Sequence, residues 1–309
     1  MSIIIRLLLP FLALPLMAAA PAPTPATAPQ LLPPVACTAG QDCWIVHYVD
    51  TDAGETAADY RCGRQTYDAH QGTDFAIRDM ATMNEGIAVL AAAAGTILRV
   101  RDTIDDRVPS EAEIEKMLAE NRGCGNGIVL DHGDGWQTIY CHLKKGSVIV
   151  KPDDKVTAGQ HLAMVGHSGA AEFPHLHFGV FKDSKVIDPF TGNSDDKDCR
   201  ATQQSMWLPG LTLPYRPASL YAAGFADSAP DYDSLLQRAR NPDSLPVSAP
   251  ALTFWVLMYN AAAGDEIAMR INAPDGSVLA ERTLTQEKTR ARQYYYVGKR
   301  NNALLPAGA

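Results

Sequence analysis

Hydrophobic and polar residues alternate with a period of two along most of the chain after residue 43, in short runs separated by Gly, Asp and Asn. Successive side chains of a strand point to opposite faces of a sheet, so this period is typical of β-strands. Because most of these runs have no helical pattern between them, we expect them to pair as antiparallel strands. The pattern predicts strands at residues 44–49, 87–100 (two strands around Gly95), 126–130, 136–143, 145–150, 161–166 and 175–181.

Two local signals interrupt this succession of strands. Residues 132–135, with the sequence His-Gly-Asp-Gly, predict a hairpin turn. One helix is predicted after Ser110, because Ser110 and Glu113 form a capping box and Gly123 provides a stop. We expect this helix to pack on an edge of the sheet, with a roof over a groove as the alternative. Its apolar face carries Ile114, Met117 and Leu118.

The sequence changes character after residue 190. Residues 215–240 hold two weakly helical pieces, 218–225 and 232–239, interrupted by proline. Alternation then returns, and it predicts strands at residues 251–259, 266–271, 277–284 and 290–297. The expected fold class is mainly β: an antiparallel β-sheet core with one inserted helix, followed by a small β-sandwich-like C-terminal module. Residues 301–309 carry no strand pattern, so we expect that module to be incomplete.

The first 20 residues have the pattern of a signal peptide. Arg6 precedes an apolar run at residues 7–17, and three alanines follow at 18–20. A buried helix would have to contain Pro10 and Pro15, at a cost of roughly 3 kcal/mol each. We therefore expect export, to the periplasm or the outside. No stable membrane anchor is expected, because the run is too short to span a bilayer and no cysteine follows the alanines. Residues 21–36, rich in Pro, Ala and Thr, are expected to form an extended linker.

Composition narrows the possible partners. The chain has 309 residues, 46% of them hydrophobic, which is enough for a sizeable core in one or two domains. Lys and Arg number 27 against 35 Asp and Glu, giving a net charge of -8. This balance argues against a nucleic-acid partner and against a basic membrane-surface protein.

Six cysteines follow the predicted signal peptide. An even number in an exported chain indicates disulfides, whereas the lack of a Cys-x-x-Cys pair disfavours a zinc site with cysteine ligands. Spacing alone does not fix the pairing. The expected bonds are a short local loop, a bond across the predicted hairpin and a bond that ties the two ends of a domain: Cys37–Cys43, Cys124–Cys141 and Cys62–Cys199.

Two pairs of potential metal ligands lie in the first part of the chain. His175 and His177 are separated by one residue in a predicted strand, so their imidazoles face the same side while Leu176 faces the core. His70 and Asp74 are four residues apart in a loop that runs into a strand. Two imidazoles and a carboxylate, with a fourth position left for water, are typical of catalytic zinc. Spacing alone leaves open which of His175 and His177 would bind the metal.

Residues 62–190 resemble the lysostaphin-type (LytM-like) zinc endopeptidases, which cut bacterial cell-wall peptides. The resemblance rests on motifs that occur in the family's order: His70-x-x-x-Asp74, residues 127–133, residues 140–143, Val156-x-Ala158-Gly159-Gln160, Gly166-His167-Ser168-Gly169, residues 174–178 and Asp188-Pro189.

The resemblance implies one Zn²⁺ ion per chain, bound by His70, Asp74 and His177, and a catalytic pair formed by His142 and His175. Zinc would polarise the scissile carbonyl and lower the pKa of its water to about 7. One histidine of the pair could take that proton and pass it to the leaving amine, while the other stabilises the oxyanion. We expect the zinc metallopeptidase domain that contains this resemblance to span residues 37–200; the C-terminal module at residues 201–309 lies outside the resemblance.

The remaining histidines are assigned ordinary positions. His132 is expected to be structural in the hairpin turn, and His47, His161 and His167 are expected at the surface or in loops. By strand alternation Tyr140 faces the same side as His142, where its hydroxyl could bind the oxyanion; a place in the core is the equal alternative.

The sequence therefore predicts an exported zinc metalloendopeptidase that hydrolyses peptide bonds in peptidoglycan stems or cross-bridges. Two alternatives stay open: a non-catalytic activator of a cell-wall amidase, and a zinc protease that acts on ordinary proteins. The activator is disfavoured because such relatives usually lose zinc ligands, whereas all three ligands and both catalytic histidines are present. Substrate preference is left open by Glu172 and Gly179, which depart from the pattern of many relatives.

Overall fold

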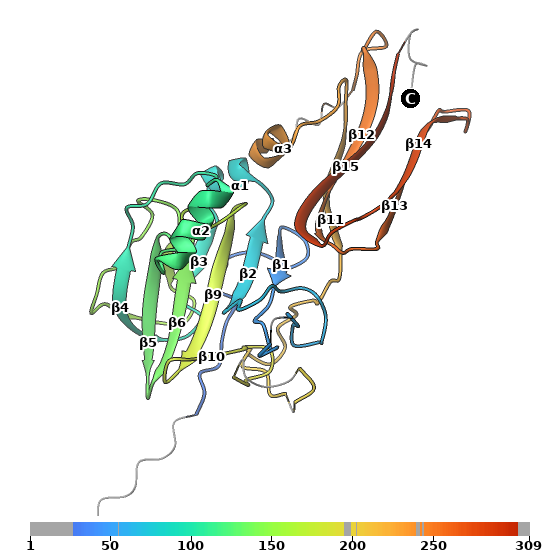
Figure 1. Cartoon of the computed structure of the whole chain (residues 1–309). Coiled ribbons are helices and arrows are strands. Elements are labelled where there is room, and N and C mark those ends of the chain that lie inside the picture. The colour runs from blue at the N-terminus through green and yellow to red at the C-terminus, as the bar shows by residue number, and fades with distance from the viewer. Residues whose placement is uncertain are drawn as a thin grey trace, which may run out of the picture.

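The computed structural model describes residues 27–54, 56–194, 199–201, 203–238, 242 and 244–301. The predicted signal peptide and the first part of the predicted linker lie outside these residues. Two β-rich units are visible in Figure 1: a large sheet built from residues 43–187, and a smaller assembly of long strands built from the last third of the chain. The prediction of a mainly antiparallel β protein is confirmed.

The large sheet has eight strands in the order β1-β2-β9-β6-β5-β4-β7, with β10 paired to β9. Every pairing between its strands is antiparallel. The strands are β1 (Cys43–His47), β2 (Thr73–Ile77), β4 (Gly95–Arg101), β5 (Gly127–Gly133), β6 (Trp136–Cys141), β7 (Lys155–Val156), β9 (His175–Lys182) and β10 (Lys185–Ile187), and a separate two-stranded ribbon is formed by β3 (Ala88–Leu90) and β8 (His161–Met164). The predicted hairpin is present between β5 and β6. Residues 145–150, predicted as a strand, form a turn and irregular chain instead.

Helix α2 (Glu111–Ala119) begins as predicted, with Ser110 as N-cap and both hydrogen bonds of the capping box to Glu113. It ends before Gly123, and none of its residues is buried; Leu118 is 59% exposed. The predicted packing of its apolar face against the sheet is therefore not seen. A second, short helix, α1 (Met80–Glu85), was not predicted, and it buries Met80 and Met83.

The C-terminal unit contains two antiparallel layers. One is a three-stranded sheet in the order β11-β12-β15, formed by β11 (Ser219–Ala226), β12 (Ala251–Ala261) and β15 (Arg290–Arg300). The other is a hairpin of β13 (Glu266–Asn272) and β14 (Val278–Thr285). Apolar side chains of β12, β13 and β15 form a small core between the layers. Helix α3 (Tyr232–Arg238) lies where a weak helix was predicted, whereas the other weak helix, 218–225, is strand β11.

The chain packs on the large sheet over a longer stretch than the predicted domain limits. Leu31 and Val35, in the predicted linker, are almost fully buried, and the Leu31 N–H donates to Met206 O at 2.8 Å. At the other end, Gln65 donates its side-chain amide to Arg216 O at 2.7 Å. Because Leu31 and Val35 pack in the hydrophobic core of the first unit, this part of the chain is not a free linker. Residues 206–216 likewise stay with the first unit.

All six cysteines form disulfides, and the pairs are the predicted ones: Cys37–Cys43, Cys62–Cys199 and Cys124–Cys141. Cys62–Cys199 joins the loop before β2 to the chain after β10. No helix in the described part of the chain is long and apolar enough to cross a membrane.

Asp188, in the Asp-Pro motif after β10, is fully buried. Its Oδ1 accepts the Phe190 N–H at 2.8 Å, whereas Oδ2 has no partner among the described residues. Burial raises the pKa of the Asp188 carboxyl from the ordinary 3.8 to about 7. The carboxyl is thus a structural group whose charge opposes folding.

We expect the free energy of unfolding to fall as the pH rises from about 4 to about 7, because the folded protein keeps a proton on Asp188 that the unfolded chain releases. Below this window both states are protonated and the contribution is fully present; above it the contribution is lost. Asp188→Asn cannot ionise and should flatten this slope in urea unfolding measured at several pH values. Glu287→Gln, at an exposed carboxyl, is the control. Equal slopes in wild type and Asp188→Asn would contradict the expectation.

Candidate metal centre

Three side chains predicted as metal ligands meet on one face of the large sheet. Asp74 lies in β2 directly opposite His177 in β9, as the antiparallel register pairs these two residues. His70 lies at the end of the loop that enters β2, and its ring is 5.0 Å from that of His177 between centroids. Paired residues of antiparallel strands point to the same face, so the sheet itself brings Asp74 and His177 together.

The atoms that could bind a metal converge. Asp74 Oδ1 is 3.2 Å from His70 Nε2 and 2.9 Å from His177 Nδ1, and the two nitrogens are 3.1 Å apart. Ligand atoms about 2.0–2.1 Å from a tetrahedral zinc lie about 3.4 Å from one another. The three atoms therefore need only a small outward movement to surround one ion.

Hydrogen bonds and nearby charges suit His70 and Asp74 to binding a metal ion. His70 Nδ1 lies 2.7 Å from Tyr48 O, and a carbonyl oxygen can only accept, so Nδ1 donates and Nε2 is the nitrogen that faces Asp74 and His177. Asp74 is 2% exposed; burial raises the pKa of its carboxyl, but the surrounding histidines outweigh burial and hold the pKa well below its usual range. The site thus presents an ionised carboxylate. Gly72 leaves the space that the His177 ring fills, since a Cβ there would lie 2.7 Å from His177 Nε2.

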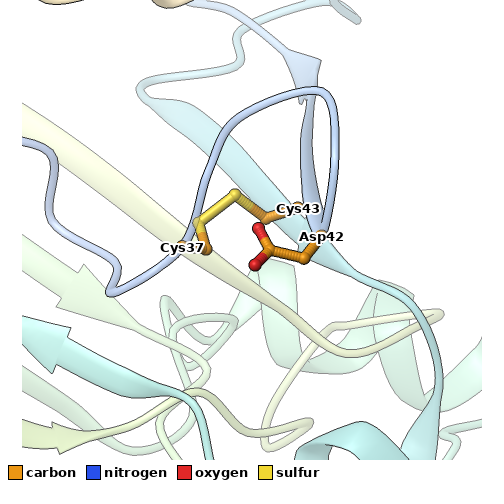
Figure 2. Close-up of side chains that lie close together, drawn as sticks. All are labelled: Cys37, Asp42 and Cys43. Atoms are coloured by element: carbon orange, nitrogen blue, oxygen red, sulfur yellow. A yellow bond between two sulfur atoms is a disulfide. The ribbon is translucent and has the colours of Figure 1, made fainter.

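A second group of possible ligand atoms, Cys37, Asp42 and Cys43, lies on the loop before β1. Figure 2 shows that its two sulfur atoms are bonded to each other, so neither is available as a thiolate. The Asp42 carboxylate accepts the Thr38 N–H at 2.6 Å. This group is therefore part of a disulfide-bonded turn. Among the described residues, only the group of His70, Asp74 and His177 has all its ligand atoms available for a metal.

The predicted catalytic pair lies beside the three ligand candidates. The rings of His142 and His175 are 4.6 Å apart between centroids, and His175 Nε2 is 3.8 Å from Asp74 Oδ1. His142 Nδ1 donates to Ser168 O at 2.8 Å, and His175 Nδ1 donates to Phe173 O at 2.8 Å. Because carbonyl oxygens hold both Nδ1 protons, the Nε2 lone pairs of both rings are free.

Burial controls the charge of this pair. It lowers the pKa of His142 well below the usual range, and the neighbouring His175 and His177 lower it further. Burial also lowers the pKa of His175, although Asp74 acts in the opposite direction. Both imidazoles are therefore neutral near pH 7 and can accept a proton at Nε2. The structure brings all five predicted site residues into one cluster.

The expectation that Tyr140 shares a face with His142 is wrong. Strand β6 ends at Cys141, and His142 adopts a positive φ of 59°, so alternation does not continue through it. Tyr140 is fully buried, and its hydroxyl accepts the Ala92 N–H at 2.8 Å. The tyrosine is a core residue that faces away from the metal site.

His47 was assigned to the surface or a loop, but it contacts a predicted metal ligand. The β1–β2 register, shifted by a bulge before His47, places it opposite Asp74, and its Nδ1 lies 2.9 Å from Asp74 Oδ2. The carboxylate thus has one oxygen toward His70 and His177 and the other toward His47. Nothing in the local sequence indicates this contact, because it depends on which strands pair and in which register.

The other histidines have structural contacts. His132 binds Ala94 O at 2.7 Å and Thr138 Oγ1 at 2.9 Å, which fits its expected structural role. His161 lies on β8, with Nε2 2.9 Å from Ala163 O. His167 lies in the loop between β8 and β9, one of the two expected positions, but it is fully buried, and its Nε2 is 2.9 Å from Ala171 O. Its neighbour Ser168, in the Gly-His-Ser-Gly motif, supplies the carbonyl that orients His142, so this motif contributes to the geometry of the predicted catalytic pair.

Comparison with known proteins agrees with the predicted family. Residues 68–189 match the profile described as Peptidase family M23. A protein of Haemophilus influenzae named "Uncharacterized metalloprotease" is 30% identical over 122 residues, which are 40% of this chain and 20% of that protein. The "Peptidoglycan DD-endopeptidase ShyA" of Vibrio cholerae is 27% identical over 124 residues, 40% of this chain and 23% of that protein. The chain thus spans between a fifth and a quarter of the length of these curated relatives.

Among solved structures, the chain is similar to the catalytic domain of the antimicrobial peptidase lysostaphin from Staphylococcus simulans. The sequence identity is 29%, the match covers 39% of this chain and 76% of that chain, and the TM-score is 0.29.

Proposed function

We propose that the protein, whose residues 68–189 match the profile of Peptidase family M23, is an exported zinc metalloendopeptidase that hydrolyses peptide bonds in peptidoglycan stems or cross-bridges. The observation that carries the proposal is the convergence of His70, Asp74 and His177 beside the pair His142 and His175. Relatives named metalloprotease and peptidoglycan DD-endopeptidase support the reaction and the substrate class.

The donor set suits zinc. His70 Nε2, Asp74 Oδ1 and His177 Nδ1 would hold the ion, and the contact of His70 Nδ1 with Tyr48 O turns Nε2 toward the other two ligand atoms. Bound there with an open fourth position, zinc would act as a Lewis acid toward the scissile carbonyl and would lower the pKa of a coordinated water to about 7.

The chain's own residues supply the proton transfers. His142 and His175 each keep an Nε2 lone pair, so either ring can accept the proton of the attacking water and return it to the leaving amine. The ring that has taken the water's proton is an imidazolium, which can stabilise the oxyanion before it passes that proton to the leaving amine. Their burial keeps bulk water away from these transfers.

The experiment is digestion of purified, cross-linked peptidoglycan by the zinc-loaded full chain, with mass spectrometry of the released fragments. The proposal expects new amino and carboxyl termini within stem or cross-bridge peptides. Parallel samples contain casein, or the same wall with a cell-wall amidase. Cleavage of casein alone, or stimulation of the amidase without any new peptide termini, would overturn the proposal.

His47 is expected to strengthen metal binding through Asp74. Partners that orient a metal ligand typically contribute about 10–100-fold to metal affinity. We therefore expect His47→Ala to raise the Kd for zinc by about that factor, whereas His47→Gln, whose amide can still donate to Asp74 Oδ2, should retain part of the affinity. Competition with a chelator of known affinity measures this. His161→Ala, at a histidine that does not contact the three candidate ligands, is the control, and equal affinities in all variants would show that His47 has no such role.

A further inference from the structure

One loop orients both histidines of the proposed catalytic pair. Residues 166–174, here called the histidine-orienting loop, connect β8 to β9. Near its start, Ser168 O accepts the Nδ1–H of His142, and near its end Phe173 O accepts the Nδ1–H of His175, each at 2.8 Å. A shift of this loop would therefore move both acceptors, and with them the direction of both Nε2 lone pairs.

The first unit fixes the start of the loop. Ser168 Oγ accepts the Asn126 N–H at 2.9 Å and donates to Leu143 O at 2.7 Å. Gly125, at a φ of 62°, lies so close that a Cβ there would be 2.4 Å from the Ser168 carbonyl carbon. The acceptor for His142 is thus enclosed by the large sheet and its connections.

The end of the loop lies against the C-terminal unit instead. Phe173 is 3% exposed, and its ring lies between the His175 ring, 5.2 Å away, and the ring of Tyr259 in β12, 5.8 Å away. Tyr259 is fully buried, and its hydroxyl donates to the carbonyl oxygen of Ile77, the last residue of β2, at 2.8 Å. One side chain of the C-terminal unit therefore contacts the support of His175 and the end of the strand that carries Asp74.

Tyr259 is itself held in place. Its ring stacks on Tyr221 with centroids 4.1 Å apart, and Trp44 of β1 packs against both rings at 5.4 and 5.7 Å. The guanidinium of Arg292, 6% exposed, lies over the Tyr221 ring at 5.6 Å and binds the Tyr221 hydroxyl. These contacts make a continuous aromatic core between the two units, which gives Tyr259 a fixed position.

Helix α3 adds a second connection on the same side. Arg238 at its end binds Glu85 of α1 at 2.8 Å and lies 3.8 Å from Asp79, the N-cap of α1. The two units thus also contact each other through α3 and through α1, which lies in the segment between β2 and β3.

We propose that the C-terminal unit is a working part of the active site, in which Tyr259 is a positioning residue that holds Phe173 and thereby the carbonyl that orients His175. This inference rests on the proposed peptidase function for its kinetic consequences, but the contact itself can be tested without it. The C-terminal unit would then contribute to the rate of hydrolysis independently of any binding to the wall.

The kinetic test uses the zinc-loaded full chain. Tyr259→Leu removes the ring that contacts Phe173, and small misplacements of catalytic groups can cost up to about 10²-fold in rate. We expect kcat to fall by up to about that factor, with unchanged zinc content and little change in KM. Tyr259→Phe keeps the ring and loses only the bond to Ile77 O, so kcat should return close to the wild-type value.

Tyr295→Leu is the matched control. Tyr295 is also a buried tyrosine of the C-terminal sheet, 6% exposed, but its hydroxyl donates to Gln286 within the same unit at 2.8 Å. Tyr295→Leu should lower the free energy of unfolding as Tyr259→Leu does, but it should leave kcat unchanged. Equal kcat in Tyr259→Leu and Tyr295→Leu would overturn the inference.

A spectroscopic readout separates this inference from the proposed function. In ¹⁵N spectra of the imidazole nitrogens, wild-type His175 should show a single Nδ1–H tautomer, and Tyr259→Leu should show mixed tautomers at His175 while His142 is unchanged. This pattern in a protein that never cuts wall peptides would support the positioning contact and count against the peptidase. An unchanged His175 tautomer in Tyr259→Leu would refute the positioning role even if the protein is an active peptidase. If Tyr259→Leu does not fold, Phe173→Leu tests the same contact from the other side, with the same expected outcomes.

Discussion

Replacing His70 or His177 by alanine is expected to abolish bound zinc and peptide hydrolysis together. Each change leaves two of the three candidate ligands, and with zinc lost the attacking water has no metal to lower its pKa. Activity should fall toward the uncatalysed rate, a loss of about 10⁶-fold or more. Metal analysis of the purified variants, with wall digestion on the same samples, measures both quantities.

His161→Ala is the control for this pair of variants, because His161 lies on β8 and its ring contacts Ala163 O rather than the candidate ligands. It should keep one zinc per chain and full activity. Stoichiometric zinc in both His70→Ala and His177→Ala would remove these two side chains from the metal site.

Replacing His142 by alanine should give a different result, with zinc retained and activity lost. His142 is not one of the three candidate metal ligands, so its loss should leave zinc bound. Its Nδ1 donates to Ser168 O, and the substitution therefore removes the free Nε2 that would transfer the proton. Removing one general acid–base group typically lowers the rate about 10²–10⁴-fold, roughly 3–5 kcal/mol of transition-state stabilisation. The assay is the rate of peptide release from purified wall, with zinc measured in the same preparation.

The same variant distinguishes an enzyme from an activator. A protein that only stimulates a cell-wall amidase would show no cleavage of its own, and His142→Ala would leave that stimulation intact. Hydrolysis at equal rates in wild type and His142→Ala would keep the enzyme and remove the proposed role of this histidine. His132→Ala, at a histidine whose two ring nitrogens bind Ala94 and Thr138, controls for general loss of a buried imidazole.

Much of the site could be predicted because its signals are local. The one-residue spacing of His175 and His177 in a strand places both rings on one face, and the structure shows both there, with His177 opposite Asp74. The ligand assignment itself came from the resemblance to a family and stays a prediction until metal is measured. The expected disulfide pairs are also those of the structure. The hairpin brings Cys124 near Cys141, and the remaining spacings suit one short local loop and one bond between the two ends of the domain.

Local sequence patterns gave wrong predictions where the backbone conformation or the pairing with another strand determined the structure. Alternation placed Tyr140 beside His142, but the strand ends between them and His142 turns to a positive φ. Residues 218–225, rich in alanine, suggested a weak helix, yet pairing with β12 makes them strand β11, because tertiary context overrides intrinsic propensity. Leu31 and Val35 looked like linker and instead fill a core.

By itself the sequence determined the period of the strands, the start of α2 and the residue types of a zinc site, since each depends on neighbours a few residues away or on a family pattern. Only the tertiary structure decided that His47 contacts Asp74, that Ser168 and Phe173 hold the two histidines, and that Tyr259 of the C-terminal unit packs on Phe173. These contacts join residues far apart in the chain. They are determined jointly by strand register, by a bulge and by the packing of the two units. No local pattern records them, because the free energy that selects them comes from burial across the whole fold.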